Sequence, residues 1–182
     1  MDVVNSFGGF ELIATYAPSA VATLDITAGF SSDYDVHLIT YDRVTPATDA
    51  VTLSIRFSQN AGSTFLAGAT DYTFAGLAEF SEATNAANNS TGTTAITICT
   101  AVGNVALEAI SGWTMLVGMR SSAGPKRAIS YTSYATAAGL HAILYTAGAL
   151  ILNETAVNGI RFLHSSGNIA SGNVSVYGLR KL

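Results

Sequence analysis

A two-residue alternation of apolar and polar side chains in AVTLSIRFS, residues 50–58, constrains the fold more than any other feature. From Val51 to Phe57, every odd position is apolar, and Thr, Ser and Arg fill the even positions. Successive side chains of a β-strand point to opposite faces of its sheet. The segment is therefore predicted to be a strand with one buried face and one polar face.

Similar patterns recur along the chain, separated by turn-forming Gly, Asn and Pro. Further strands are predicted in GFELIATYA, SAVATLDIT, YDVHLITYDRV, TTAITICT, GWTMLVGMRS, KRAISYTSYA, LHAILYTAG, NGIRFLHS and NVSVYGL. The strand at residues 34–44 is apolar on both faces, which favours a central position between two layers. About ten short strands without βαβ alternation predict an all-β fold, an antiparallel β-sandwich of jelly-roll-like type.

Neither a linker nor an internal repeat divides the chain, so residues 1–182 are expected to form a single jelly-roll domain. Residues 1–9 contain Gly8 and Gly9 as a hinge, and they are either an N-terminal arm laid on a neighbour or a frayed end. Residues 76–92, rich in Ala, Asn, Ser and Thr, are expected to form a protruding loop, with a short helix near Leu77–Phe80 as an alternative. Such a loop either touches a neighbour or is a passive insertion.

Charged residues are sparse, at 11% of the chain, whereas apolar residues make up 49%. Soluble domains typically carry about 25% charged residues, and free monomers use them for solubility. The composition therefore favours a surface that is partly covered by neighbouring molecules.

The charge distribution argues against two classes of partner. The net charge is −4, and the basic residues pair only at Lys126-Arg127 and Arg180-Lys181. No basic stripe could follow a phosphate backbone, so no nucleic-acid partner is expected. No apolar run is long enough to span a membrane, and the first ten residues show no secretory signal. No membrane partner is expected either.

No motif of catalysis or of a resident metal is visible. The three histidines, His37, His141 and His164, lie in different strand-like segments without metal-ligand spacing. Each is expected to be packed or surface-exposed. The single cysteine, Cys99, lies in an alternating apolar run and is expected to be a small core residue. We therefore predict no enzyme activity, no catalytic, cofactor-binding or metal-binding residues, and no cofactor.

Two further groups of residues leave alternatives open. Asp33 and Asp35, with Asp42 following, could bind calcium, but Asp at a loop-to-strand boundary is the favoured interpretation. The only tryptophan, Trp113, is expected to pack in the core. Tyr131 and Tyr134 are the better exposed candidates for sugar binding.

Two longer segments resemble a pattern found in structural proteins of tailed-bacteriophage virions. SSDYDVHLITYDRVTPATDAVTLSIRFSQNAGSTF resembles its series of strands and turns, and LHSSGNIASGNVSVYGL is similar to its usual C-terminal segment. The resemblance is best over residues 33–75 and 157–179. The turn at Asn60-Ala61-Gly62 departs from the more usual Asp-Gly-Gly.

The resemblance implies a jelly-roll module of the capsid decoration (cement) type. Such a protein forms a homotrimer that braces neighbouring capsomers, so its partners are other copies of itself and the major capsid protein or another virion protein. Its location would be the virion, on the capsid surface or in the tail, after synthesis in the host cytoplasm. A tail or fibre component and a carbohydrate (receptor)-binding module remain as alternatives. The family has no catalytic residues to carry over.

Overall fold

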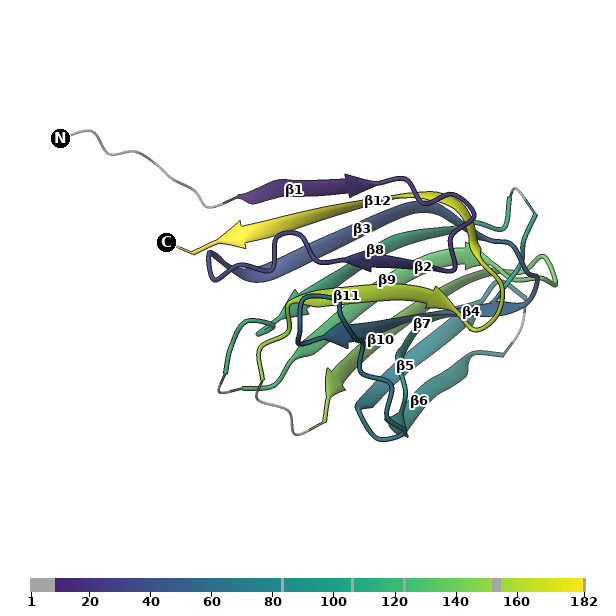
Figure 1. Ribbon diagram of the computed structural model, residues 1–182. Helices are drawn as coiled ribbons and strands as arrows, with labels where there is room; N and C mark the ends of the chain where they lie inside the picture. The colour runs from purple at the N-terminus through teal and green to yellow at the C-terminus, as the bar shows by residue number, and fades with distance from the viewer. Residues whose placement is uncertain (1–8, 83, 106, 123, 152–154, 182) are drawn as a thin grey trace.

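The computed structural model describes residues 9–82, 84–105, 107–122, 124–151 and 155–181, which form twelve β-strands and no helix (Figure 1). The strands are β1 (Phe10–Tyr16), β2 (Thr23–Ile26), β3 (Tyr34–Pro46), β4 (Val51–Ser58), β5 (Tyr72–Phe80), β6 (Ala86–Thr93), β7 (Ile96–Val102), β8 (Ile110–Val117), β9 (Arg127–Ala135), β10 (His141–Leu150), β11 (Gly159–His164) and β12 (Ile169–Arg180).

The strands form two antiparallel sheets packed face to face. The larger sheet has the order β1-β12-β3-β8-β9-β10-β5-β6, and the smaller has the order β2-β11-β4-β7. This arrangement confirms the predicted all-β antiparallel sandwich. The strand number exceeds the eight of a simple jelly roll, because the larger sheet alone contains eight.

The chain crosses repeatedly between the two sheets, and these crossings bring distant segments together. The first four strands alternate between the larger and the smaller sheet, and β12 inserts between β1 and β3 (Figure 1). Phe10 thus lies opposite Leu179, and Val36 lies on the other side of Leu179. The strand at residues 34–44, expected to lie between two layers, is an inner strand of the larger sheet, with one face toward the core and the other on the exterior of the sandwich.

The core lies between the sheets and is filled by the alternating residues seen in the sequence. Leu53, Ile55 and Phe57 of β4 are fully buried, as are Ile96 and Ile98 of β7. Gly148 of β10 lies beneath β7, and a Cβ atom there would come within 2.7 Å of the Ile96 side chain. A glycine at this position allows the two sheets to approach closely.

The structure corrects the expected loop at residues 76–92. β5 continues to Phe80, and the edge strand β6 pairs with it, with Leu77 opposite Ala87. Both the protruding loop and the short helix near Leu77–Phe80 are therefore wrong. β6 is made of small and polar residues without apolar alternation, so pairing with β5 specifies it rather than burial. Of the proposed arm, residues 1–8 lie outside the described residues, and Gly9 is exposed just before β1.

Candidate interaction surface

The larger sheet turns one face toward the core and the other away from it, and we call the second face the outer face. Side chains alternate between the two faces along each strand. The outer face is mainly apolar and carries Phe10, Leu12, Val36, Leu38, Ala75, Leu77, Trp113, Met115, Val117, Ile129, Tyr131, Ile143, Tyr145, Ala147, Ala149, Tyr177 and Leu179.

An aromatic row crosses the middle of the outer face. Trp113 of β8 lies directly opposite Tyr131 of β9, which lies opposite Tyr145 of β10. The Trp113 and Tyr131 rings are stacked with centroids 6.5 Å apart, and the Tyr131 and Tyr145 rings are 4.9 Å apart. Leu77 of β5 continues the row beyond Tyr145. Tyr145 is 47% exposed, so an aromatic surface faces outward here.

A second apolar row runs beside the aromatic row. Its members lie opposite one another in register across seven strands, in the order Ala75, Ala147, Ile129, Met115, Leu38, Tyr177 and Leu12. Leu12, at the β1 end of this row, is 54% exposed. The second row is therefore apolar almost from one sheet edge to the other and joins the aromatic row into one apolar surface, whereas beyond Trp113 the aromatic row itself continues with the polar Thr40 and Ser175.

Charged side chains lie at the rim of the outer face. Glu79 lies opposite Ile143 at one end of the strands, and Asp42 lies at the same end, where its carboxylate accepts a hydrogen bond from Ser111 of β8. Arg127 lies opposite Ala149 in the row at the other end. An apolar centre with a charged rim is the usual anatomy of a protein–protein interface.

The inner face of the same strands contains hydroxyl groups where a core would normally be apolar. Thr114, Ser130 and Thr132 are buried there, between the two sheets. The Tyr41 hydroxyl lies 3.0 Å from Thr132 Oγ1 and donates a hydrogen bond to the Trp113 carbonyl at 3.2 Å. In the middle of β8 and β9, Trp113 and Tyr131 thus face outward while Thr114, Ser130 and Thr132 face inward, although Leu116 and Tyr134 of the same strands still pack in the core. This pattern is the reverse of that expected for a sheet with a solvated outer face.

The exposed face of the smaller sheet provides the contrast, because it is polar. Arg161 of β11 forms two 2.6 Å hydrogen bonds to the Asp25 carboxylate of β2. Its guanidinium also lies 4.1 Å from the centre of the Phe65 ring. Thr52 and Ser54 of β4 point to the same side as Arg56, between the buried positions of that strand. The exposed face of the smaller sheet is therefore polar, whereas the outer face of the larger sheet is mainly apolar.

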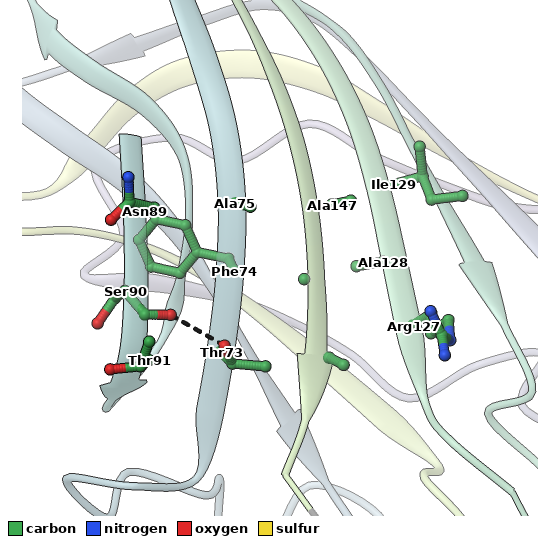
Figure 2. A pocket seen from close by; sticks show the side chains of 12 residues that line it. Thr73, Phe74, Ala75, Asn89, Ser90, Thr91, Arg127, Ala128, Ile129 and Ala147 are labelled. Atoms are coloured by element: carbon green, nitrogen blue, oxygen red, sulfur yellow. Dashed lines mark hydrogen bonds between the residues drawn. The ribbon is translucent and has the colours of Figure 1, made fainter. Parts of the chain in front are cut away.

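The outer face is shallow and contains no deep cleft among the described residues. A hollow of about 550 Å³ lies over the aromatic row between Leu77 and Trp113. A second hollow lies beside β5, β9 and β10, where Figure 2 shows the short side chains of Ala75 and Ala147 next to Ile129. Thr73 there donates a 2.9 Å hydrogen bond to the Ser90 carbonyl, which fixes β6 to β5. Open, shallow hollows suit a flat partner better than an enclosed small molecule.

Two of the aromatic predictions need correction. Trp113 is not a core residue, because it lies half-buried on the outer face. Tyr134 is only 3% exposed and packs in the core, 3.2 Å from Thr100 Oγ1. Tyr131 does lie on the outer face. Its neighbour Tyr145 was not among the sequence candidates. The segment LHAILYTAG is apolar at both its odd and its even positions, and this pattern indicates a strand with apolar side chains on both faces.

The histidines and the cysteine lie apart from the outer face. His37 and His164 are buried, whereas His141 is exposed at the start of β10. His37 Nε2 donates a 2.9 Å hydrogen bond to the Gly29 carbonyl, and burial lowers the pKa of this imidazole. Cys99 is fully buried, and burial raises the pKa of its thiol. Among the described residues, no three His, Cys, Asp or Glu side chains are grouped in a way that could hold a metal.

The aspartates singled out in the sequence are tied to neighbouring polar groups. Asp35 forms a 3.0 Å ion pair with Lys181, and the Asp33 carboxylate accepts a 3.1 Å hydrogen bond from the Ser31 hydroxyl. Asp33 lies in a turn directly before β3, as expected for a loop-to-strand boundary. Asp42 instead accepts a hydrogen bond from Ser111 of β8.

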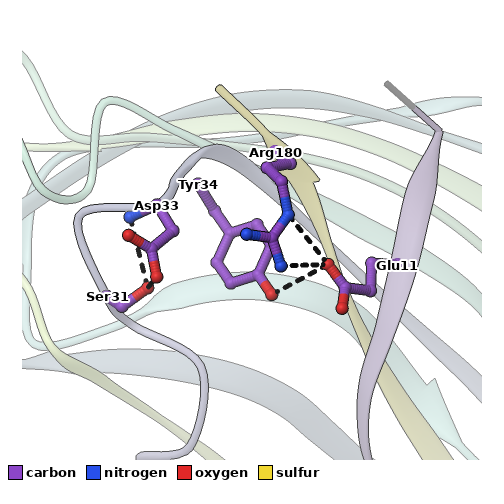
Figure 3. A network of polar contacts seen from close by, with 5 residues as sticks. All are labelled: Glu11, Ser31, Asp33, Tyr34 and Arg180. Atoms are coloured by element: carbon purple, nitrogen blue, oxygen red, sulfur yellow. Dashed lines mark hydrogen bonds and ion pairs between the residues drawn. The ribbon is translucent and has the colours of Figure 1, made fainter. Parts of the chain in front are cut away.

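An ion-pair network beside Asp33 holds the two terminal strands together. Figure 3 shows Arg180 of β12 and the Tyr34 hydroxyl of β3 both directed at the Glu11 carboxylate of β1, with distances of 2.9 and 3.2 Å. The Arg180 guanidinium is the main cause of the lowered pKa of Glu11. The network ties β1, which carries Phe10 and Leu12 of the outer face, to the rest of the sheet.

Within the described segments there is no helix with the length and hydrophobicity that crossing a bilayer requires. The sequence matches no protein-family model, no curated protein and no solved structure at a significant level.

Proposed function

We propose that this protein is a structural component of a tailed-phage virion that works by adhesion rather than by catalysis. The observation that carries the proposal is the contrast between the polar exterior of the smaller sheet and the apolar outer face of the larger one. Monomeric proteins rarely leave a continuous apolar patch of more than about 300–600 Å² open to water. A protein built in this way functions with its outer face covered.

Within the virion, the protein acts as a homotrimeric decoration protein that braces neighbouring capsomers, as its resemblance to virion proteins implies. A trimer that straddles several capsomers holds each through separate contacts, so one capsomer cannot be displaced without breaking several contacts. A sandwich with one continuous hydrophobic core between its sheets suits this task, because bracing requires a body that does not deform. A tail position uses the same properties with a different partner.

Immunogold labelling of intact phage particles, with an antibody raised against this protein, tests the proposal. We expect gold particles on virions, over the shell for a decoration protein and over the tail for a tail component. The proposal would be contradicted if virions purified from cells that make the protein carry no gold label and show no band of its mass. Particles of a deletion strain provide the control for antibody specificity.

The aromatic row supports a second candidate function, carbohydrate binding. Trp113, Tyr131 and Tyr145 present ring faces on which a sugar could stack. Leu77, Ile129 and Met115 beside them are apolar, however, and the polar side chain opposite Trp113 is only the short hydroxyl of Thr40. The structural role is therefore favoured. Saturable quenching of Trp113 fluorescence by a host-surface polysaccharide would favour the carbohydrate module instead.

A further inference from the structure

We propose that the outer face packs against the outer faces of further copies of this chain, with the aromatic row of Trp113, Tyr131 and Tyr145 at the centre of the contact. The inference deepens the proposed function, since it names the occupant of the face on which that function depends.

The extent of the outer face matches what a stable contact between proteins requires. Eight strands spaced by about 4.8 Å give a width of about 34 Å, and the four rows from Ile143 to Val117 extend about 20 Å along the strands. The product is about 700 Å² for the whole face, which is close to the roughly 800 Å² that each partner contributes to a standard interface, and the two contacts of a ring would share it.

The composition of the face fits a contact with the outer faces of other copies. A face carrying one dominant sign of charge would repel its own copy, but the centre of this face is uncharged and its rim carries charges of both signs, in Glu79, Asp42 and Arg127. Large aromatic residues at the centre of a contact contribute most of its binding energy. The row from Trp113 to Tyr145 has this composition and this position.

The width of the sheet also suits an assembly around a threefold axis. In such a ring each copy meets two neighbours and needs two separate contact regions. The aromatic row with Leu77 supplies one region over β5, β10, β9 and β8. Leu12, Tyr177 and Leu38 supply the other over β1, β12 and β3. The polar exterior of the smaller sheet is then left outside the ring.

Sedimentation combined with Trp113 fluorescence tests the inference, because Trp113 is the only tryptophan of the chain. We expect an oligomer at micromolar concentration, and we expect Trp113 emission to shift to longer wavelength as dilution dissociates it. In Tyr145→Lys, burying a charge at the centre of the contact should weaken association by about 100-fold or more.

Thr52→Lys is the matched control, since Thr52 lies on the polar exterior of the smaller sheet. It should associate as the unchanged protein does, and far-UV circular dichroism should show that both variants are folded. A monomeric unchanged protein whose emission is independent of concentration would overturn the inference, as would a folded Tyr145→Lys protein that associates normally.

The same measurements separate this inference from the proposed function. An oligomer that depends on Tyr145 but is absent from virions leaves the inference standing and contradicts the function. A monomer at high concentration that nevertheless labels virions supports the virion location, contradicts the homotrimeric form and overturns the inference, because the outer face would then be covered by a different virion protein.

Discussion

Trp113 and Tyr131 stack on each other, with ring centroids 6.5 Å apart, on the side of the larger sheet that faces away from the core. Their immediate chain neighbours, Thr114 and Thr132, point inward and take part in a buried hydroxyl network. In the middle of β8 and β9, aromatic residues therefore face the exterior and hydroxyl-bearing residues face the core. The outward rings are available for the proposed contact with other proteins, and the buried hydroxyls are available to stabilise the interior.

The buried network around Tyr41 should contribute to stability. Tyr41→Phe removes the hydroxyl that lies near Thr114 and Thr132 and leaves these buried groups with fewer partners. We expect the free energy of unfolding to fall by about 1–2 kcal/mol, measured by urea denaturation at fixed protein concentration. Tyr177→Phe, half-buried on the outer face, is the control and should change stability by less than about 0.5 kcal/mol. Equal effects of the two variants would refute a special role for the network.

Close packing of the sheets at Gly148 should make this position sensitive to a single methyl group. In Gly148→Ala, the added Cβ would lie 2.7–2.9 Å from three carbons of the buried Ile96 side chain. We expect a loss of about 1–3 kcal/mol in the free energy of unfolding. Ile96→Val in the same chain should recover part of this loss by removing the δ-methyl group. A double-mutant cycle with no coupling between the two positions would be incompatible with this packing.

Acidification should destabilise the protein through its buried histidines. Both ring nitrogens of His164 are buried without a hydrogen-bond partner among the described residues, and burial lowers the pKa of this imidazole to about 4. The nearby main chain of Thr52 favours the charged imidazolium, but it offsets only part of this lowering of the pKa. The unfolded chain takes up a proton near pH 6.5, so stability is complete above that pH and falls as the pH approaches 4.

The loss attributable to His164 should reach about 3 kcal/mol. Urea denaturation of the unchanged protein and of His164→Leu, each measured from pH 7.5 to pH 4, isolates this contribution as the difference between their slopes. Parallel pH dependences for the two proteins would show that His164 is not the group responsible. His37, whose pKa is also lowered by burial, should add a pH dependence of the same sign that persists in His164→Leu.

Much of the fold could be predicted from the sequence, because alternation in segments such as residues 50–58 depends only on burial of one strand face. The edge hairpin could not, since β6 lacks apolar alternation and forms by pairing with β5. The position of Trp113 was mispredicted for a related reason. In a strand that is apolar on both faces, periodicity assigns residues to two sides but does not say which side meets the core. Only the placement of β7 over β9 and β10 decides that Thr132 faces inward and Tyr131 outward.

The most direct test of whether the outer face is covered is the labelling rate of a cysteine placed on it. The native Cys99 is fully buried and its thiol pKa is raised by that burial, so it should stay unreactive in the folded protein. Ala147→Cys places a small thiol beside the aromatic row, and Thr52→Cys places one on the smaller sheet. Each variant is labelled with a maleimide at high and at low protein concentration.

We predict that Ala147→Cys is protected at high concentration and becomes at least about 10-fold more reactive on dilution, as expected for a contact that dissociates. Thr52→Cys should react at the same rate at both concentrations. An Ala147→Cys thiol that reacts equally fast at every concentration, in a protein that remains folded, would contradict a covered outer face.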